Sequence, residues 1–296
     1  GRGGGPIQAT LKSQPPNSVN GKIRITDQGE VIQQKYGYEP LAKYNLCSYI
    51  GAVVQATLNP PPEPDTKWKR LIEEMSETSM KSYRSNINEK SDFIRYFRTV
   101  TPHKALGKLS IGSRPSKRKN IDNIKSLRAI PWVFAWTQIR LFLPAWLGTT
   151  EALNYASSKP FKKTLMEMEK KWPFFNSTMD ILDMVISKVD PEISRVYENQ
   201  LADKKLKIVG KKLRLQFESL KRLNKLITPI QIRKQRKKFR TSVIIRNIYS
   251  EVLHITQSIV MKKLSSKKLN KNQKQYLNDA LMTSIAGISA AMKNTG

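Results

Sequence analysis

The feature that most constrains the fold is the helical spacing of apolar residues, which continues almost unbroken through the second half of the chain. Apolar side chains that recur every three or four residues predict amphipathic helices. The later segments with this spacing are 150–171, 176–188, 190–223, 229–262 and 270–293. The earlier ones are 31–58, 66–86 and 90–99. No period of 20–50 residues recurs, so a repeat architecture is not indicated.

Short strands are also expected. Residues 22–26 alternate as Lys-Ile-Arg-Ile-Thr, the apolar run 130–136 is typical of a buried strand, and a third strand is expected around Leu109. Strands that are each followed by helices indicate the end of a parallel barrel. The expected fold class is therefore mostly α, the C-terminal part of a helix-rich (β/α)8 barrel with two or three short parallel strands.

The composition is that of a globular protein. The chain has 296 residues, 39% of them hydrophobic, and five tryptophans, so one or two domains are expected. The single cysteine, Cys47, cannot form an internal disulfide, which favours a reducing compartment. Its apolar neighbours predict that it is buried and inert.

Charge points to an alternative function. The 53 lysines and arginines exceed the 23 acidic residues and give a net charge of +30. Such a surface suits a non-enzymatic nucleic-acid-binding protein that uses residues 204–240, where the excess is concentrated. Lysine outnumbers arginine, however, whereas phosphate-binding patches favour arginine's planar fork. A solvated helical face is therefore the favoured interpretation of 204–240, including its run 232–240.

The apolar segment 129–148 raises the question of a membrane span. Arg140 and Gln138 lie in its middle, and Pro131 and Pro144 interrupt it. A charge at bilayer depth is costly, and proline disrupts a helix. We therefore expect a buried segment.

Three arginines have settings that suit anion binding. Arg2 lies in Gly-Arg-Gly-Gly-Gly-Pro at residues 1–6, where successive glycines can expose backbone N–H groups to an anion. Arg114 and Arg128 precede a run rich in tryptophan. A guanidinium beside a dry wall binds phosphate or carboxylate strongly through two parallel bonds. The competing interpretation is a structural arginine paired with a carboxylate.

A metal site is not indicated. His103 and His254 have no carboxylates or second histidine at ligand spacing. No pair of acidic residues follows an expected strand to hold Mg²⁺. Several aromatic residues are expected to be core rather than a base-stacking platform. These are Trp132, Trp136, Trp146, Phe174 and Phe175.

The motifs, taken in order, resemble the phosphoenolpyruvate carboxylase family. They are Gly1-Arg2-Gly3-Gly4, Gln28-Gly29-Glu30, Gly112-Ser113-Arg114, Arg128 before Ala-Ile-Pro-Trp, Trp172-Pro173-Phe174-Phe175 and Lys293-Asn294-Thr295-Gly296. The resemblance extends from end to end but covers only the C-terminal third or so of such an enzyme. It implies a barrel region at 1–148 and a helical region at 149–296 with the allosteric site.

The resemblance implies a cytoplasmic, homotetrameric lyase that supplies the tricarboxylic acid cycle with oxaloacetate. Its substrates would be phosphoenolpyruvate and bicarbonate, and its cofactor Mg²⁺, with ligands in the region that precedes this one. Arg2, Arg114 and Arg128 would be catalytic, and Arg114 and Arg128 would bind the substrate. The isolated chain is expected to be inactive because the general base and the metal ligands are missing.

The resemblance also implies an inhibitory aspartate site. Its residues would be Arg2, Lys188, Arg246 and Asn294. The surrounding pattern departs from the family in three places. Residues 251–254 read Glu-Val-Leu-His instead of Asp-Pro-Leu-Asn, Lys293 replaces an arginine, and Ala291 replaces a glycine. These departures are expected to weaken inhibition.

Overall fold

The computed structural model describes residues 11, 13–19, 21, 36–87, 92–107, 129–266 and 268–292, with the backbone alone at 129, 130, 230–240, 242 and 246. The chain divides into two compact units. The first contains Gly1–Glu73 and Lys159–Ile181, and the second contains Glu74–Ser158 and Leu182–Gly296. The predicted functional division at residue 148 stays a prediction.

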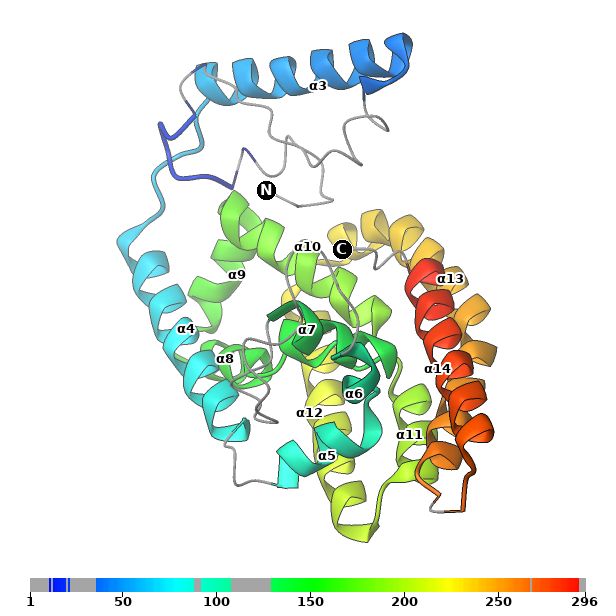
Figure 1. Cartoon of the computed structure of the whole chain (residues 1–296). Helices are drawn as coiled ribbons and strands as arrows, with labels where there is room; N and C mark the ends of the chain where they lie inside the picture. The colour runs from blue at the N-terminus through cyan, green and yellow to red at the C-terminus, as the bar shows by residue number, and fades with distance from the viewer. Residues whose placement is uncertain are drawn as a thin grey trace. The chain divides into compact units, whose positions relative to one another are not determined.

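The first unit is built from helices (Figure 1), which hold a small aromatic cluster. It holds α3 (Glu39–Leu58), the start of α4 (Thr66–Asn86), α9 (Lys162–Lys171) and the start of α10 (Pro173–Lys188). Trp68 stacks on Trp172 with ring centroids 6.1 Å apart, and Trp172 lies 5.2 Å from Phe174. Helix α3 ends at Leu58, where the predicted segment 31–58 ends, and the prolines at 60–62 follow it.

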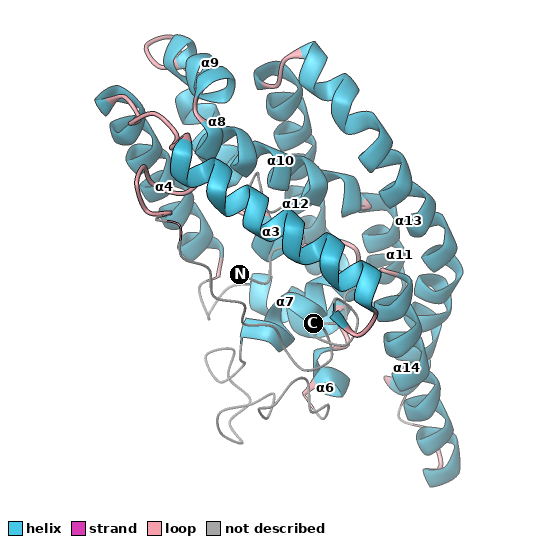
Figure 2. Ribbon diagram, turned by 90° about the horizontal axis from the view of Figure 1, so that it is seen from above, coloured by secondary structure: helices cyan, strands magenta, loops and turns pink. Residues whose placement is uncertain are grey.

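The second unit contains the larger core. Its further helices are α5 (Asp92–Val100), α6 (His103–Leu106), α7 (Ala129–Gln138), the 3-10 turn η2 (Leu143–Ala145), α8 (Thr149–Ala156), α11 (Pro191–Leu201), α12 (Lys204–Ile227), α13 (Ile230–Leu264) and α14 (Lys271–Ala291). Helices α13 and α14 form a hairpin, with α11 against α13 and α12 against α5 and α8. Figure 2 shows helices and loops throughout the described part.

Capping residues explain where the later helices begin. The Asp190 carboxylate accepts bonds from the N–H groups of Glu192 at 3.0 Å and Ile193 at 3.2 Å. Asp203 accepts one from Leu206 at 2.9 Å, and Asn270 forms a capping box with Gln273. Side-chain oxygens in these places satisfy N–H groups that the first helical turn leaves unpaired. The predicted helix 190–223 is therefore two helices, with a new start after Asp203.

Helix content was predicted well, and the strand at 130–136 was wrong. The predicted segment 66–86 coincides with α4, whereas 150–171 divides into α8 and α9. Residues 130–136 belong to helix α7. Proline is tolerated in the first turn of a helix, so Pro131 does not oppose it, and a short apolar run has no period that separates strand from helix. No strand occurs in the described ranges, and the predicted strands at 22–26 and Leu109 lie outside them.

Aromatic side chains fill the core of the second unit. The Phe97 ring lies 4.7 Å from the Trp132 ring and 5.2 Å from the Trp136 ring. Trp136 and Trp146 are buried, as predicted for core residues. In the first unit Phe175 is buried, also as predicted, whereas Phe174 is 41% exposed. The prediction that Cys47 is buried was wrong, because it lies on an exposed face of α3.

A buried ion pair links three helices of this unit. The carboxylate of Glu198 on α11 pairs with Arg214 on α12 and accepts a 2.8 Å bond from the Tyr96 hydroxyl on α5. Burial, followed by the charge of Glu198, raises the pKa of Tyr96 well above its usual value, so the hydroxyl stays a donor. Gly210 on α12 makes room for this carboxylate, since a Cβ there would lie 2.1 Å from Glu198 Oε1.

The hydropathy of the described helices agrees with the expectation that segment 129–148 is buried in a helical protein. In the part of the chain that the structure describes, no helix is both long enough and apolar enough to span a bilayer.

Gly148 provides a test of this packing. It has φ +91°, and a Cβ would lie 2.4 Å from the Ser79 carbonyl oxygen. We expect Gly148→Ala to lower the free energy of unfolding by roughly 2–4 kcal/mol, from left-handed strain and steric clash. Urea unfolding of the 296-residue chain measures this.

Gly51→Ala is the matched control. Gly51 lies within helix α3, and a Cβ there meets nothing within 4 Å. Alanine should raise stability by about 0.5–1 kcal/mol, because glycine is a poor helix former. Equal effects of the two substitutions would contradict the described approach of Gly148 to α4.

Candidate functional site

The described part of the second unit is organised around one buried cation, Arg140. It follows α7 in a turn with φ +57°, and its side chain is 1% exposed. Its N–H donates to the Thr137 carbonyl at 3.0 Å. A left-handed conformation is costly for a residue with a Cβ and persists only where the surroundings impose it.

The Arg140 guanidinium joins three segments. Its Nε donates to the Lys188 carbonyl at 3.4 Å, and its Nη1 donates to the Asn247 carbonyl at 3.1 Å. Its Nη2 lies 3.5 Å from Asp190 Oδ2. In return, the N–H of Asp190 donates to the Arg140 carbonyl at 2.9 Å. We call this set, Arg140, Lys188, Asp190 and Asn247, the arginine junction.

The surroundings of the arginine junction keep the Arg140 guanidinium positively charged. Burial lowers the pKa of Arg140, while Asp190 and then Glu251 oppose that effect. Arginine has so high an ordinary pKa that the group remains protonated. A buried cation is stabilised by nearby carboxylate or carbonyl oxygen atoms. Arg140 therefore links Lys188 at the end of α10 to Asn247 on α13.

The junction brings together segments that carry predicted effector residues. Lys188 contributes its carbonyl directly, and Arg246 is the chain neighbour of Asn247. Asn247 Nδ2 also donates to the Ser187 carbonyl at 3.0 Å. One turn further along α13, the Ser250 hydroxyl lies 3.6 Å from Met292 Sδ, near the end of α14. Three distant parts of the sequence therefore meet here.

The structure describes only some of the predicted site residues. Lys188 Nζ lies 6.0 Å from the centre of the Phe142 ring, a weak cation–π geometry. For Arg246 the structure gives its helical backbone position on α13. Arg2, Arg114, Arg128 and Asn294 lie outside the described residues. The structure thus places one predicted side chain, Lys188, and the backbone of one more.

Sequence reasoning missed a buried polar network beside the junction. His254 Nδ1 lies 3.0 Å from the Gln138 carbonyl oxygen and 3.3 Å from the Tyr197 hydroxyl, which itself donates to Gln257 at 2.8 Å. Gln257 donates to Gln138 Oε1 and to Ser284, both at 3.1 Å. Ser250, His254 and Gln257 recur every three or four residues, a period that marks one face of a helix. This polar spacing was the signal available in the sequence.

The ionisation of His254 follows from its position. Burial is the main cause that lowers its pKa to about 3, and the charge of Arg140 adds to it, whereas the Gln138 carbonyl has a small opposite effect. The imidazole is therefore neutral at physiological pH. His103, the second histidine of the chain, begins the short helix α6, and its ring packs 5.3 Å from the Phe97 ring.

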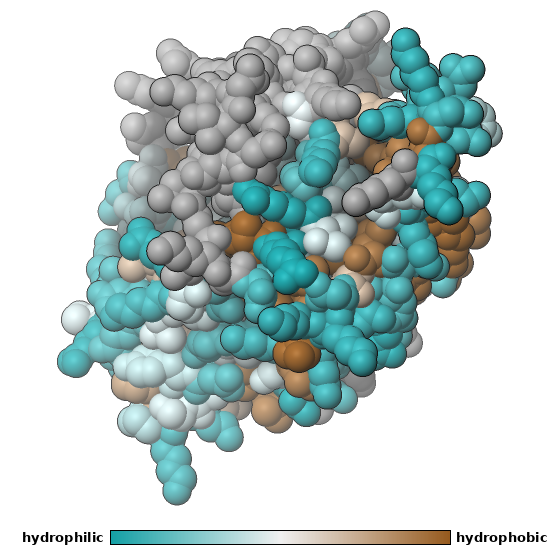
Figure 3. Space-filling model, turned by 60° about the horizontal axis from the view of Figure 1, so that its bottom comes forward, coloured by the Kyte–Doolittle hydropathy of each residue, from teal (hydrophilic) through white to brown (hydrophobic). Residues whose placement is uncertain are grey.

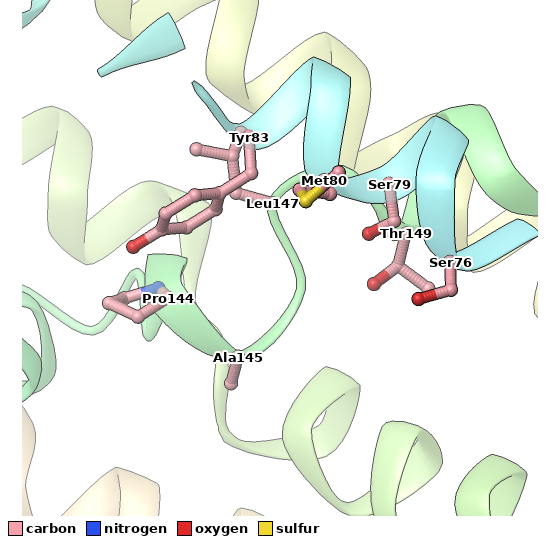
Figure 4. Close-up of a pocket in the computed structure, with 8 residues that line it drawn as sticks. All are labelled: Ser76, Ser79, Met80, Tyr83, Pro144, Ala145, Leu147 and Thr149. Atoms are coloured by element: carbon pink, nitrogen blue, oxygen red, sulfur yellow. The ribbon is translucent and has the colours of Figure 1, made fainter. Parts of the chain in front are cut away.

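A separate pocket lies in the same unit (Figure 4). It has a volume of about 360 Å³ and lies between α4 and the segment from η2 to α8. Its lining residues are Ser76, Ser79, Met80, Tyr83, Pro144, Ala145, Leu147 and Thr149. None of these carries a charge, so the lining offers hydroxyl groups but no cation for a phosphate or a carboxylate.

No metal site occurs among the described residues, since they contain no group of three or more His, Cys, Asp or Glu side chains placed to hold an ion. The fold and the junction define a helical domain organised around a buried guanidinium. Comparison with known proteins supplies its family. The family model for phosphoenolpyruvate carboxylase matches residues 1–296, and the chain belongs to that family.

Curated relatives show the same similarity. The chain is 43% identical over 297 residues to the phosphoenolpyruvate carboxylase of Hahella chejuensis and 45% identical over 305 residues to that of Acinetobacter baumannii. The alignments cover 100% of this chain but 34% and 33% of those proteins. The chain therefore spans about a third of the length of these relatives, in their C-terminal part.

The buried His254 predicts a pH dependence of stability. Its pKa is about 3 in the folded chain and 6.5 as the ordinary value. Between these values the unfolded chain binds a proton that the folded chain excludes, so stability falls as the pH falls. From pH 7 to pH 5 this group alone should remove about 2 kcal/mol of unfolding free energy.

His254→Asn should remove that part of the dependence, because asparagine does not titrate. Urea midpoints of both proteins at pH 7 and pH 5 measure the difference. As control, Ile208→Asn at an exposed position on α12 removes no titrating group and should leave the slope of the parent protein. Parallel pH profiles for the parent and His254→Asn would show that His254 is not the buried neutral group described above.

Proposed function

We propose that this chain is the C-terminal part of a phosphoenolpyruvate carboxylase, a lyase that forms oxaloacetate and phosphate from phosphoenolpyruvate and bicarbonate. The observation that carries the proposal is the family match across residues 1–296. The names of the relatives support the same activity. The rest of the active site would be in the part of those relatives that this chain does not match.

The chemistry requires fixed cations. A bicarbonate oxygen attacks the phosphorus of phosphoenolpyruvate, the bond from phosphorus to the enol oxygen breaks, and carboxyphosphate and an enolate form. Carboxyphosphate then releases carbon dioxide and phosphate, and the enolate carbon attacks the carbon dioxide to give oxaloacetate. Negative charge resides on oxygen throughout, so guanidinium groups in a water-poor site stabilise the transition states.

Arg114 and Arg128 would supply those guanidinium groups, with Arg2 as a third. Arg128 immediately precedes α7 in the sequence, and α7 begins with the apolar Ala-Ile-Pro-Trp. Trp136 on that helix is fully buried, and Trp132 packs edge-on against it at 5.6 Å. A rigid, aromatic helix directly after the arginine supports a role in holding the substrate's phosphate.

The wider context is part of the proposal. The described helices would belong to a (β/α)8 barrel enzyme, a cytoplasmic homotetramer with Mg²⁺ as its cofactor. The described residues offer no set of ligands that fits Mg²⁺, so its ligands would lie in the part of the relatives that precedes this one. The chain's own contribution would be to bind and orient the substrate's anionic groups.

Aspartate would act as inhibitor at Lys188, Arg246, Asn294 and Arg2. The arginine junction supports this site, because it brings Lys188, the α13 turn that carries Arg246 and the end of α14 close together. A carboxylate ligand suits a region where cations converge. The Glu-Val-Leu-His sequence at 251–254 would reduce the strength of inhibition.

The activity can be tested with a chimera in which this chain replaces the matching third of the Hahella chejuensis relative. We expect the chimera to form oxaloacetate and the 296-residue chain alone to form none, since the general base and metal ligands would come from the relative. Arg128→Ala in the chimera should lower kcat/KM at least about 100-fold, corresponding to roughly 2.7 kcal/mol of transition-state stabilisation. Coupled oxidation of NADH measures oxaloacetate.

Lys211→Ala, at an exposed position on α12, is the control and should keep the parental rate. A folded chimera without turnover, or an Arg128→Ala chimera with parental kinetics, would refute the proposed activity or the proposed role of Arg128.

The effector site has its own test in the same chimera. Lys188→Ala should raise the aspartate concentration for half inhibition about tenfold or more, because one charge-assisted hydrogen bond is lost. The KM for phosphoenolpyruvate should change little. Inhibition curves for Lys188→Ala and Lys211→Ala that coincide would exclude Lys188 from the aspartate site.

A further inference from the structure

Helix α13 has its polarity inverted relative to an ordinary surface helix. The face that packs on α11 and α14 carries polar side chains, among them Ser250, His254, Gln257 and Ser258, and all four are buried. The opposite face is exposed and mostly apolar, with Glu251 and Thr256 as exposed polar residues beside the apolar ones. We call this exposed set the isoleucine face: Ile244, Ile245, Ile248, Tyr249, Val252, Ile255 and Ile259.

The isoleucine face is continuous. Its members recur at intervals of three and four residues along α13, so they form one stripe roughly 22 Å long from the helical rise. At its centre Ile248 is 62% exposed, Tyr249 77% and Val252 70%. Apolar surface is also visible among hydrophilic side chains on the face drawn in Figure 3. A contiguous apolar stripe of this length is typical of an interface.

We propose that the isoleucine face is the docking surface for the part of the carboxylase that this chain does not contain. The chain matches about a third of its relatives, in their C-terminal part, so two thirds of those proteins remain to be packed against it. A helix that is packed on one side and apolar on the other is built to lie between two layers of a core. The inference rests on family membership and not on turnover.

Other occupants fit less well. A second copy of this chain would bring together two chains that each have a net charge of +30, and the two would repel each other. An anionic bilayer would bind a helix whose opposite face is polar and in water, whereas the opposite face of α13 is buried against α11 and α14. A region of the same enzyme outside this chain could cover the isoleucine face without bringing two strongly cationic chains together and without a polar face of α13 in water.

Thiol reactivity tests the proposal. Cys47 is the only cysteine of this chain, so Cys47→Ser removes its own thiol, and peptide mass spectrometry separates the thiol of Ile248→Cys from any cysteine of the relative's part. Ile208→Cys on α12 is the matched control, because Ile208 is 68% exposed and lies on another helix. Both variants are made in the isolated chain and in the Hahella chejuensis chimera described above, and their rates with a maleimide are compared.

We expect both thiols to react rapidly in the isolated chain. In the chimera the thiol at 248 should react at least tenfold more slowly, while the thiol at 208 keeps its rate. Equal rates at 248 in the two proteins, or equal slowing at both positions, would overturn the proposal. Because reactivity does not depend on catalysis, an inactive chimera that still protects 248 would count against the proposed function alone.

Slow reaction at 248 in the isolated chain would also overturn it. Slowing that grows with chain concentration would identify a second copy as the occupant, and slowing that needs anionic phosphatidylserine vesicles would identify a membrane. Concentration-independent slowing would show that this chain covers the face itself.

A second variant keeps the test decisive if the chimera does not fold. Ile248→Lys with Val252→Lys should leave the isolated chain as stable as Ile208→Lys does, and a greater loss would show a face already covered.

Discussion

The contacts of the buried Arg140 guanidinium hold together several segments of the second unit. The Arg140 guanidinium is almost completely removed from water, and its donors reach carbonyl groups of α10 and α13 and the Asp190 carboxylate. A buried cation without partners is very unfavourable, so these segments have little freedom to move apart. The left-handed turn at Arg140 is stabilised by the same contacts. The convergence of Lys188 and the Arg246 turn is a consequence of satisfying this one group.

The polar interior beside Arg140 has a related cause. A guanidinium in the core favours neutral, hydrogen-bonding neighbours, because a second cation would be repelled. His254 meets this condition with a pKa of about 3, to which the charge of Arg140 contributes. Tyr197, Gln257 and Gln138 complete a chain of hydrogen bonds in which each member is both oriented and restrained. These hydrogen bonds join α7, α11, α13 and α14, so the buried network favours one packing of the four helices.

Local patterns in the sequence predicted the helices, since amphipathic spacing and proline stops act over a few residues. The segment 66–86 agrees with α4 from end to end. Residues 130–136 failed because the run is short and apolar on all sides, so only its tertiary surroundings decide between strand and helix. The division of 190–223 depended on Asp203 as a cap, a signal that was present but weak.

The site was less predictable than the fold. Arg140 was interpreted only as an obstacle to membrane insertion, because nothing in a local window shows that its partners lie 48 and 107 residues away. His254 was judged by the absence of nearby metal ligands, whereas its role depends on Gln138 and Tyr197 from other helices. Arginines 2, 114 and 128 were selected by their local settings, and Lys188 and Arg246 by the family resemblance. The roles of all five stay predictions.

The departure at 251–254 changes the helix as well as the effector site. Where the family pattern has proline, this chain has Val252, and α13 continues unbroken from Ile230 to Leu264. A proline within a helix removes a backbone hydrogen bond and bends the helix. The unbroken helix carries both Asn247, whose carbonyl accepts from Arg140, and His254, whose Nδ1 lies against the Gln138 carbonyl. Val252 itself lies on the isoleucine face and is 70% exposed. A single helix therefore supports the arginine junction on one side and carries the isoleucine face on the other.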